Sequence, residues 1–306
     1  MGFRKQHPGA QLMSASQAEG SRFSLSWLWR PGRRHAAPIM LLLLLGFAAP
    51  LIAIVGFSFG KERTFALWQA PTFESYRTIV EETFYYSFLW SLGMAVTTVV
   101  ILVLICYPVA YGLAKIFGRW SNLITLLLVL PLFVSENVRL YGWVLFLIKG
   151  GVLLGTLKSL FGIDAESILF TPGIIVFGMV YVYLPFMLFP MTLGLSMVSR
   201  EVKEAASDLG ASRLQVFREV ELPLAMPGMI IGCLLTFVLS VGAIAEAKVL
   251  GGQSVIPIVH DIEIAFTYAQ NWPLGAALSV LLIVLVGALV LLVLRRFDLD
   301  RILGRR

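Results

Sequence analysis

Residues 200–228 decide the fold, and they read REVKEAASDLGASRLQVFREVELPLAMPG. Long apolar runs lie on both sides of this polar stretch, from 172 to 195 and from 229 to 250. Ionisable side chains are costly in the hydrocarbon core of a membrane, so a stretch this charged must face water. The stretch is therefore an aqueous insert between two segments that avoid water.

The composition extends this view to the whole chain. Of its 306 residues, 58% are hydrophobic and only 14% are charged, whereas about a quarter of the residues in soluble domains are charged. This composition predicts an all-α membrane protein with several spans. The net charge of +6 does not indicate a nucleic-acid partner, because membrane proteins concentrate Lys and Arg in their cytoplasmic loops.

Six apolar segments are long enough to cross a bilayer as helices. The first is longer than the apolar part of a secretory signal, so we expect it to be retained. The segments cover residues 39–59, 87–114, 123–148, 172–195, 229–250 and 274–294. We divide the chain into an N-terminal segment (1–37), a transmembrane domain (38–296) and a basic tail (297–306).

The positive charges predict the orientation of these spans. If the N-terminus is cytoplasmic, 17 of the 24 Lys and Arg residues fall in cytoplasmic segments. Because positive residues collect on the cytoplasmic side, we expect both termini and the polar insert to be cytoplasmic. The lipid bilayer is the expected surrounding partner.

Sequence patterns typical of catalysis are absent. The chain contains neither the phosphate-binding pattern G-x-x-x-x-G-K-[ST] nor a metal-spaced set of Cys and His residues. Cys106 and Cys233 both lie inside apolar segments, where cysteine behaves as a small buried hydrophobe. We expect a non-catalytic chain with no bound cofactor and no metal site.

The polar insert has the local signals of two short helices. Residues 201–209 favour a first helix, and Gly210 can take the left-handed conformation that ends it. Ser212 can cap the start of a second helix. We expect Pro223 and Pro227 to end that second helix before the fifth span begins.

Seven positions of the insert follow the pattern E-A-A-x3-G-x9-[IV]-x-L-P. They are Glu204, Ala205, Ala206, Gly210, Val220, Leu222 and Pro223. This pattern resembles the signature loop of the inner-membrane permease subunits of binding-protein-dependent ABC importers. Further motifs resemble the branch of that family that includes spermidine/putrescine permeases, and they cover residues 130–131, 135, 139–143, 181–187, 250–252 and 271–279. The resemblance implies a location in the bacterial inner (plasma) membrane. The resemblance covers residues 38–296.

The resemblance implies a fold, partners and an energy source. The fold would be the six-helix type I ABC importer permease, in which the insert is a coupling helix seated in a separate ATPase subunit. The ATPase dimer would use the ATP. A second permease subunit, identical or homologous, would complete the pore, and a periplasmic or surface solute-binding protein would deliver the cargo.

Ionisable residues inside spans are candidates for a translocation pathway. Glu136 and Arg139 lie three residues apart, on one helical face, and Glu246 lies near Lys248. A structural ion pair is the alternative for the first two, and contact with the membrane interface is the alternative for Glu246. Aromatic residues suited to binding a cation add Tyr141, Trp143 and Tyr183, with Tyr107, Tyr111, Tyr181 and Trp272 as further candidates.

The cargo class stays open at this point. Polyamine permeases of the branch carry an acidic-aromatic G-[DE]-[FY] pattern near the end of the fifth span, whereas residues 242–246 here read GAIAE. A polyamine-like cargo is the first expectation, and an organic anion, an amino-acid derivative or a metal ion is the alternative. A secondary transporter driven by an ion gradient would predict inverted repeats, which the sequence does not contain.

Overall fold

The computed structural model describes residues 31–65, 70–162 and 166–297, with side chains from residue 38 onward. Most of the predicted N-terminal segment (1–37) and basic tail (297–306) lies outside this part. The described residues are helical and contain no strand. Six of their helical stretches are long and apolar enough to span a membrane, which confirms the predicted fold class: Pro38–Ser58, Tyr85–Ile116, Glu136–Phe161, Pro172–Ser196, Arg213–Val241 and Trp272–Arg296.

The chain divides into two compact units, residues 1–53 and 54–306. Helix α1 (Pro31–Ser58) provides the described part of the first unit. Its apolar side chains are exposed all around; Leu42, for example, is 70% exposed. A helix that is apolar on every side is suited to lipid rather than to water.

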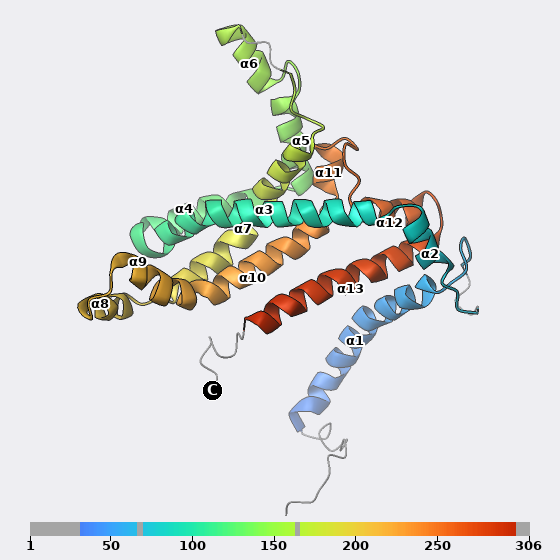
Figure 1. Ribbon diagram of the computed structural model, residues 1–306, viewed down its shortest axis with the longest axis horizontal. Helices are drawn as coiled ribbons and strands as arrows, with labels where there is room; N and C mark the ends of the chain where they lie inside the picture. The colour runs from blue at the N-terminus through green and yellow to red at the C-terminus, as the bar shows by residue number, and fades with distance from the viewer. Residues whose placement is uncertain (1–30, 66–69, 163–165, 298–306) are drawn as a thin grey trace, which may run out of the picture. The chain divides into compact units, whose positions relative to one another are not determined.

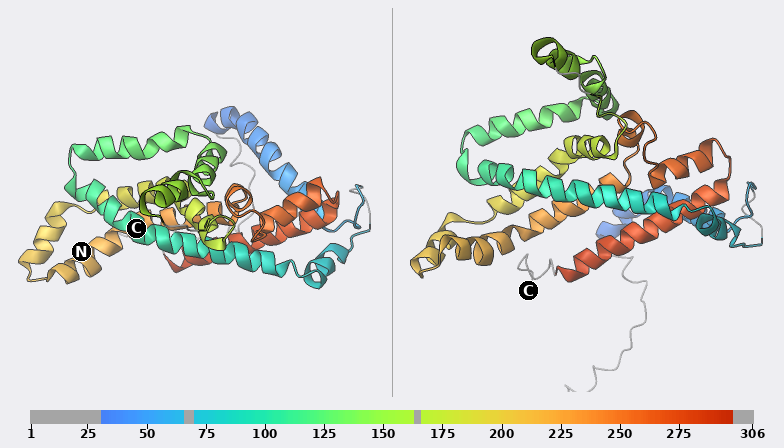
Figure 2. Two further views of the ribbon diagram at one scale, coloured as in Figure 1. Left: turned by 90° about the horizontal axis from the view of Figure 1, so that it is seen from above. Right: turned by 45° about the horizontal axis from the view of Figure 1, so that its top comes forward.

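Three long helices form the core of the second unit. Helix α7 (Pro172–Ser196) packs against both α3 (Tyr85–Tyr111) and α10 (Leu222–Val241), and Figures 1 and 2 show the three lying side by side. Gly194 and Gly228 let α7 and α10 approach closely, because a Cβ atom on Gly194 would lie 2.6 Å from the carbonyl oxygen of Ala225. Small residues at helix contacts are typical of membrane bundles.

The third span is broken where a single helix over 123–148 was predicted. Helix α4 (Trp120–Val129) continues into a 3₁₀ turn, η3 (Leu130–Phe133), and the backbone is then extended at Val134 and Ser135. Helix α5 (Glu136–Leu147) follows, and α6 (Val152–Phe161) packs against it. The break follows Pro131, which has no N–H to continue an α-helix and favours the first turn of a tighter one.

The fifth span also ends earlier than the predicted 229–250. Helix α10 stops at Val241, and after Gly242 the short helix α11 (Ala245–Val249) carries Glu246. Further short helices follow the ends of spans elsewhere: α2 (Glu74–Glu81) and α12 (Ile258–Thr267). Both pack against the last helix, α13 (Trp272–Arg296).

Candidate functional site

The first half of the polar insert folds as its sequence predicts. Helix α8 (Arg200–Asp208) is capped by Ser199, whose hydroxyl accepts a hydrogen bond from the Val202 N–H at 3.4 Å. Arg200 pairs with Glu204 at 2.6 Å across one helical turn. After Leu209, Gly210 adopts a φ of +87°, the left-handed conformation that glycine takes without steric penalty.

The second half of the insert begins at the predicted helix cap, but its helix continues beyond the predicted end. Ser212 forms a capping box with Gln215, which starts α9 (Arg213–Gln215). A π-helical turn, η4 (Val216–Glu221), then leads directly into α10. The expectation that Pro223 and Pro227 end the helix is wrong. Pro223 lies in the first turn after η4, where the hydrogen-bond register has already shifted and its missing N–H is tolerated.

The loop leaves an apolar surface uncovered by its own chain. Leu209 is 90% exposed, and Val202 and Leu214 are exposed as well. Of the pattern residues, Glu204 and Ala205 are exposed, whereas Val220 and Leu222 are half-buried. Exposed apolar side chains on a short polar helix are typical of a surface that a partner covers.

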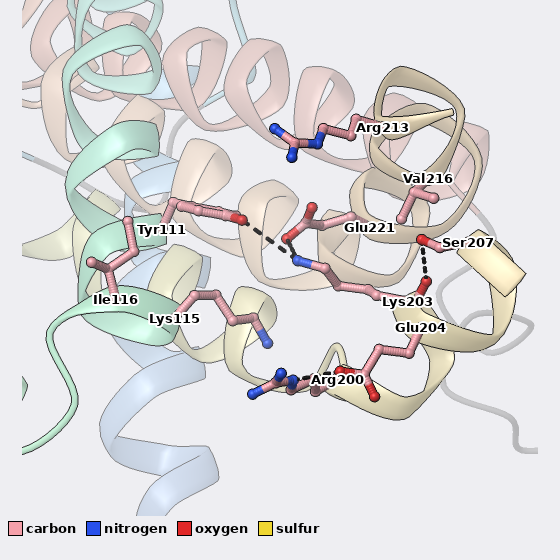
Figure 3. Close-up of a pocket in the computed structure, with 10 residues that line it drawn as sticks. All are labelled: Tyr111, Lys115, Ile116, Arg200, Lys203, Glu204, Ser207, Arg213, Val216 and Glu221. Carbon is pink, nitrogen blue, oxygen red and sulfur yellow. Dashed lines mark hydrogen bonds and ion pairs between the residues drawn. The ribbon is translucent and has the colours of Figure 1, made fainter. Parts of the chain in front are cut away.

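Behind α8 lies a cavity of about 600 Å³, which Figure 3 shows. Its central contact is an ion pair between Lys203 and Glu221, with Nζ and Oε1 3.1 Å apart. The same ammonium lies 3.5 Å from the Tyr111 hydroxyl and 5.5 Å from the centre of its ring. Lys115, on the π-helical turn η2 (Gly112–Ile116), donates a hydrogen bond to the Val198 carbonyl.

This ion pair ties α8 to the end of η4, directly before α10. Burial opposes the charge on Lys203, but the hydrogen bond and the charge of Glu221 outweigh it and raise the lysine pKa. Glu221 itself is only 4% exposed. The sequence does not predict this pairing, because 18 residues separate the two partners. The available signal was the position of Glu221 beside an apolar run, since a buried acid usually has a partner.

A second cluster forms where α5, α7 and α11 meet. Glu246 is fully buried, and neither of its carboxylate oxygens accepts a hydrogen bond from a described residue. It interacts electrostatically with Tyr183, Glu136 and Arg139, so the fold brings together four of the six residues predicted for the pathway. Burial raises the pKa of Glu246 to about 7; Glu136 adds to the rise and Arg139 opposes it.

Aromatic side chains extend this cluster along α5 and α7. The Trp143 ring meets Tyr181 edge-on, with centroids 5.6 Å apart, and Phe177 at 4.7 Å. The Arg139 guanidinium lies 5.6 Å from the centre of the Tyr181 ring, and Arg139, Trp143 and Tyr181 line one cavity. Tyr141, also predicted for the pathway, is exposed on α5.

The remaining aromatic candidates lie elsewhere. Tyr107 packs edge-on with Phe217 of η4, 6.0 Å between centroids, and Tyr111 contacts Lys203, so both connect α3 to the insert. Trp272 packs with Phe65 and Phe266. Within residues 31–65, 70–162 and 166–297, no three His, Cys, Asp or Glu residues could hold a metal ion together.

The chain is similar to known transport proteins. The family described as "Binding-protein-dependent transport system inner membrane component" matches residues 25–301. The spermidine/putrescine transport system permease protein PotB of Escherichia coli (strain K12) is 33% identical over 251 residues, covering 81% of this chain and 91% of that protein. The PotB protein of Haemophilus influenzae is 35% identical over 237 residues, covering 77% and 82%.

A solved structure has the same fold. It is a bacterial alginate ABC transporter in complex with an alginate pentasaccharide-bound periplasmic protein, and one of its chains aligns with a TM-score of 0.71. The alignment covers 88% of this chain and 93% of that chain, at 16% sequence identity. At this identity the likeness concerns the fold alone.

Proposed function

This chain belongs to the family of inner-membrane components of binding-protein-dependent transport systems, and we propose that it forms half of the translocation pathway of a polyamine importer. It is a multi-pass permease subunit of an ABC importer. A separate ATPase dimer supplies the energy and a solute-binding protein delivers the cargo. A second permease, identical or homologous, completes the pore, and both termini face the cytoplasm.

The polar insert is the coupling element of this proposal. Its support is the set of exposed apolar side chains on the insert, namely Val202, Leu209 and Leu214, together with the exposed Glu204. A short helix with such a face can seat in a groove of an ATPase subunit. The Lys203–Glu221 ion pair joins that helix to α10, so a push on the insert reaches the fifth span.

A cationic cargo is supported by one observation above all, the buried Glu246 carboxylate without a hydrogen-bond partner. A buried acid is costly unless it is paired, and an ammonium group of a polyamine would provide the missing charge. Tyr183 and Glu136 lie within electrostatic reach of it, and Trp143 and Tyr181 offer ring faces for a cation. The PotB relatives are named as spermidine/putrescine permeases.

A small anion is the second candidate cargo, and Arg139 is the observation that favours it. Its guanidinium lines the aromatic cavity, and its Nε atom is buried without a hydrogen-bond partner. Uptake assays with putrescine, spermidine and a small organic anion distinguish the two candidates. Only the polyamines should be taken up under the first proposal.

The substitution Gly210→Asp tests the coupling role. The positive φ of Gly210 sets the turn after α8, and a Cβ atom there would meet nothing within 4 Å, so a side chain alters the turn without a collision. We expect the importer to assemble and hydrolyse ATP, while uptake into proteoliposomes falls more than about tenfold, or about 1.4 kcal/mol in transition-state free energy.

Gly118→Asp is the matched control. Gly118 also has a positive φ, +48°, with open space around its Cβ position, but it lies outside the insert. This variant should transport like the unmodified protein. Normal uptake by Gly210→Asp, or permease preparations that never retain an ATPase subunit, would refute the coupling role.

A further inference from the structure

The cavity behind α8 carries more positive charge than its internal pairs need. Four basic side chains line it: Lys115, Arg200, Lys203 and Arg213. The two acids that line it, Glu204 and Glu221, already pair with Arg200 and Lys203. Two positive charges are therefore left without a carboxylate partner among the lining residues.

The two surplus cations lie on separate elements and face the same space. Arg213, at the start of α9, forms no ion pair with a described residue. Lys115, on η2, donates only to a backbone carbonyl. Figure 3 shows the two on either side of the Lys203–Glu221 pair, with the Arg213 guanidinium pointing toward the cavity. An anion that enters the cavity would therefore meet an unpaired positive charge on either side of that pair.

The position of the cavity indicates which anion fits. It lies where the candidate span Tyr85–Ile116 ends and the candidate span Arg213–Val241 begins, and the ends of spans are expected near the boundary between hydrocarbon and water. Ile116 lines it and is 67% exposed, and Trp120 is exposed just beyond. Tryptophan is enriched at this boundary, and basic pockets between span ends bind lipid headgroups.

The backbone around the cavity is unusual in the same place. Within residues 31–65, 70–162 and 166–297, the structure has two π-helical turns, η2 and η4, and both contribute lining residues. Such turns are rare and often occur at functional sites. Here they widen the helix ends that carry Lys115 and Glu221, which is consistent with a binding site rather than a packing gap.

We propose that this cavity binds the phosphate group of an anionic phospholipid, attracted by the surplus charges of Arg213 and Lys115. The headgroup enters beside the coupling helix, and the acyl chains lie along the exposed apolar side of Ile116. The bound phosphate offsets one of the two surplus charges and braces α8 against the ends of two spans. This site is separate from the proposed cargo pathway, so the proposal does not depend on which cargo the protein carries.

The test uses the complete importer in lipid nanodiscs made with phosphatidylglycerol or with phosphatidylcholine alone. Native mass spectrometry counts the phosphatidylglycerol that stays bound after detergent extraction. We expect Arg213→Gln and Lys115→Gln each to weaken retention about fivefold, the effect of one basic side chain at a membrane surface. Arg218→Gln is the matched control, because Arg218 is exposed on η4 and does not line the cavity.

Several results would overturn the proposal. Equal loss of lipid from Arg218→Gln would mean that general surface charge holds the lipid. Displacement of the lipid by low millimolar inorganic phosphate would identify a free-phosphate site. A variant that keeps its lipid but loses the ATPase subunit would identify an acidic side chain of that subunit as the occupant. Circular dichroism and gel filtration check that each variant is folded.

Discussion

Two buried glutamates, at the two ends of the α7–α10 core, have opposite environments. Glu221, within the polar insert, pairs with Lys203 at 3.1 Å. Glu246, on α11, has no hydrogen-bond partner for either oxygen, and burial raises its pKa to about 7. A paired buried acid fixes a geometry, whereas an unpaired one favours whatever brings a positive charge. The end of the core that carries Glu221 is thus suited to keep one geometry, and the end that carries Glu246 is suited to bind a positively charged group.

The largest effect should come from breaking the paired end. Lys203→Met removes the ion-pair partner of the buried Glu221, and removal of one partner of a buried pair costs about 3–5 kcal/mol. Thermal unfolding in detergent measures the loss. The double variant Lys203→Met/Glu221→Leu should recover most of it, because an apolar pair of similar volume replaces both charges.

The exposed pair of the same helix is the control for this prediction. Arg200 and Glu204 form an ion pair at a similar distance, 2.6 Å, but both side chains are mostly exposed. Water and salt screen such pairs, so Arg200→Met should leave the unfolding temperature unchanged. If Lys203→Met behaves like Arg200→Met, the buried pair does not stabilise the loop.

A smaller effect is expected at the unpaired end, and it depends on pH. The usual pKa of a glutamate is 4.5, and that of Glu246 is about 7, so the unfolded chain releases this proton at lower pH than the folded one. The folded state therefore loses stability as the pH rises from 4.5 to 7, by about 3 kcal/mol in total. Glu246→Gln should remove this slope and be more stable than the unmodified protein at pH 8.

Uptake should move in the opposite direction to stability. If Glu246 receives a cationic cargo, the more stable Gln variant should take up putrescine at least tenfold more slowly at pH 8. Glu263→Gln is the control, since Glu263 already pairs with Lys248 at 2.5 Å. A variant that keeps both the pH slope and normal uptake would contradict the comparison between the two acids.

The smallest of the three effects concerns the packing that joins the two ends. Gly194→Ala places a Cβ atom 2.6 Å from the Ala225 carbonyl and 2.9 Å from Cα of Gly228. Overpacking of this kind costs about 1–3 kcal/mol, and it should slow uptake by loosening α7 from α10. Gly93→Ala on α3 is the control, because its Cβ position meets nothing within 4 Å. An equal change in both variants would argue against a role for this contact.

The most accurate predictions from the sequence concern features that residues close together in the chain determine. The helix over 200–208, the turn at Gly210 and the cap at Ser212 each follow from chemistry within a few residues. The number of spans follows in the same way, from the length of each apolar run. These features needed no knowledge of which helices touch.

What the sequence did not predict depends on distant contacts. The breaks at Ser135 and Gly242 lie inside runs whose average hydropathy over the length of a span is high, so that average does not locate them. The grouping of Glu246 with Arg139 requires α11 to pack on α5. The local rule that proline ends a helix failed at Pro223 because a π-helical turn precedes it.

The continuity of helix from Arg213 to Val241 has a mechanical consequence. Twenty-nine residues at 1.5 Å each make a rod about 40 Å long. A tilt of about 5° around the middle of such a rod moves each end by about 2 Å, in opposite directions. The rod stops at Gly242, and Glu246 lies beyond that joint on α11. A tilt of this helix can therefore displace the end of α10 while the Glu246 carboxylate, beyond the break, keeps its own orientation.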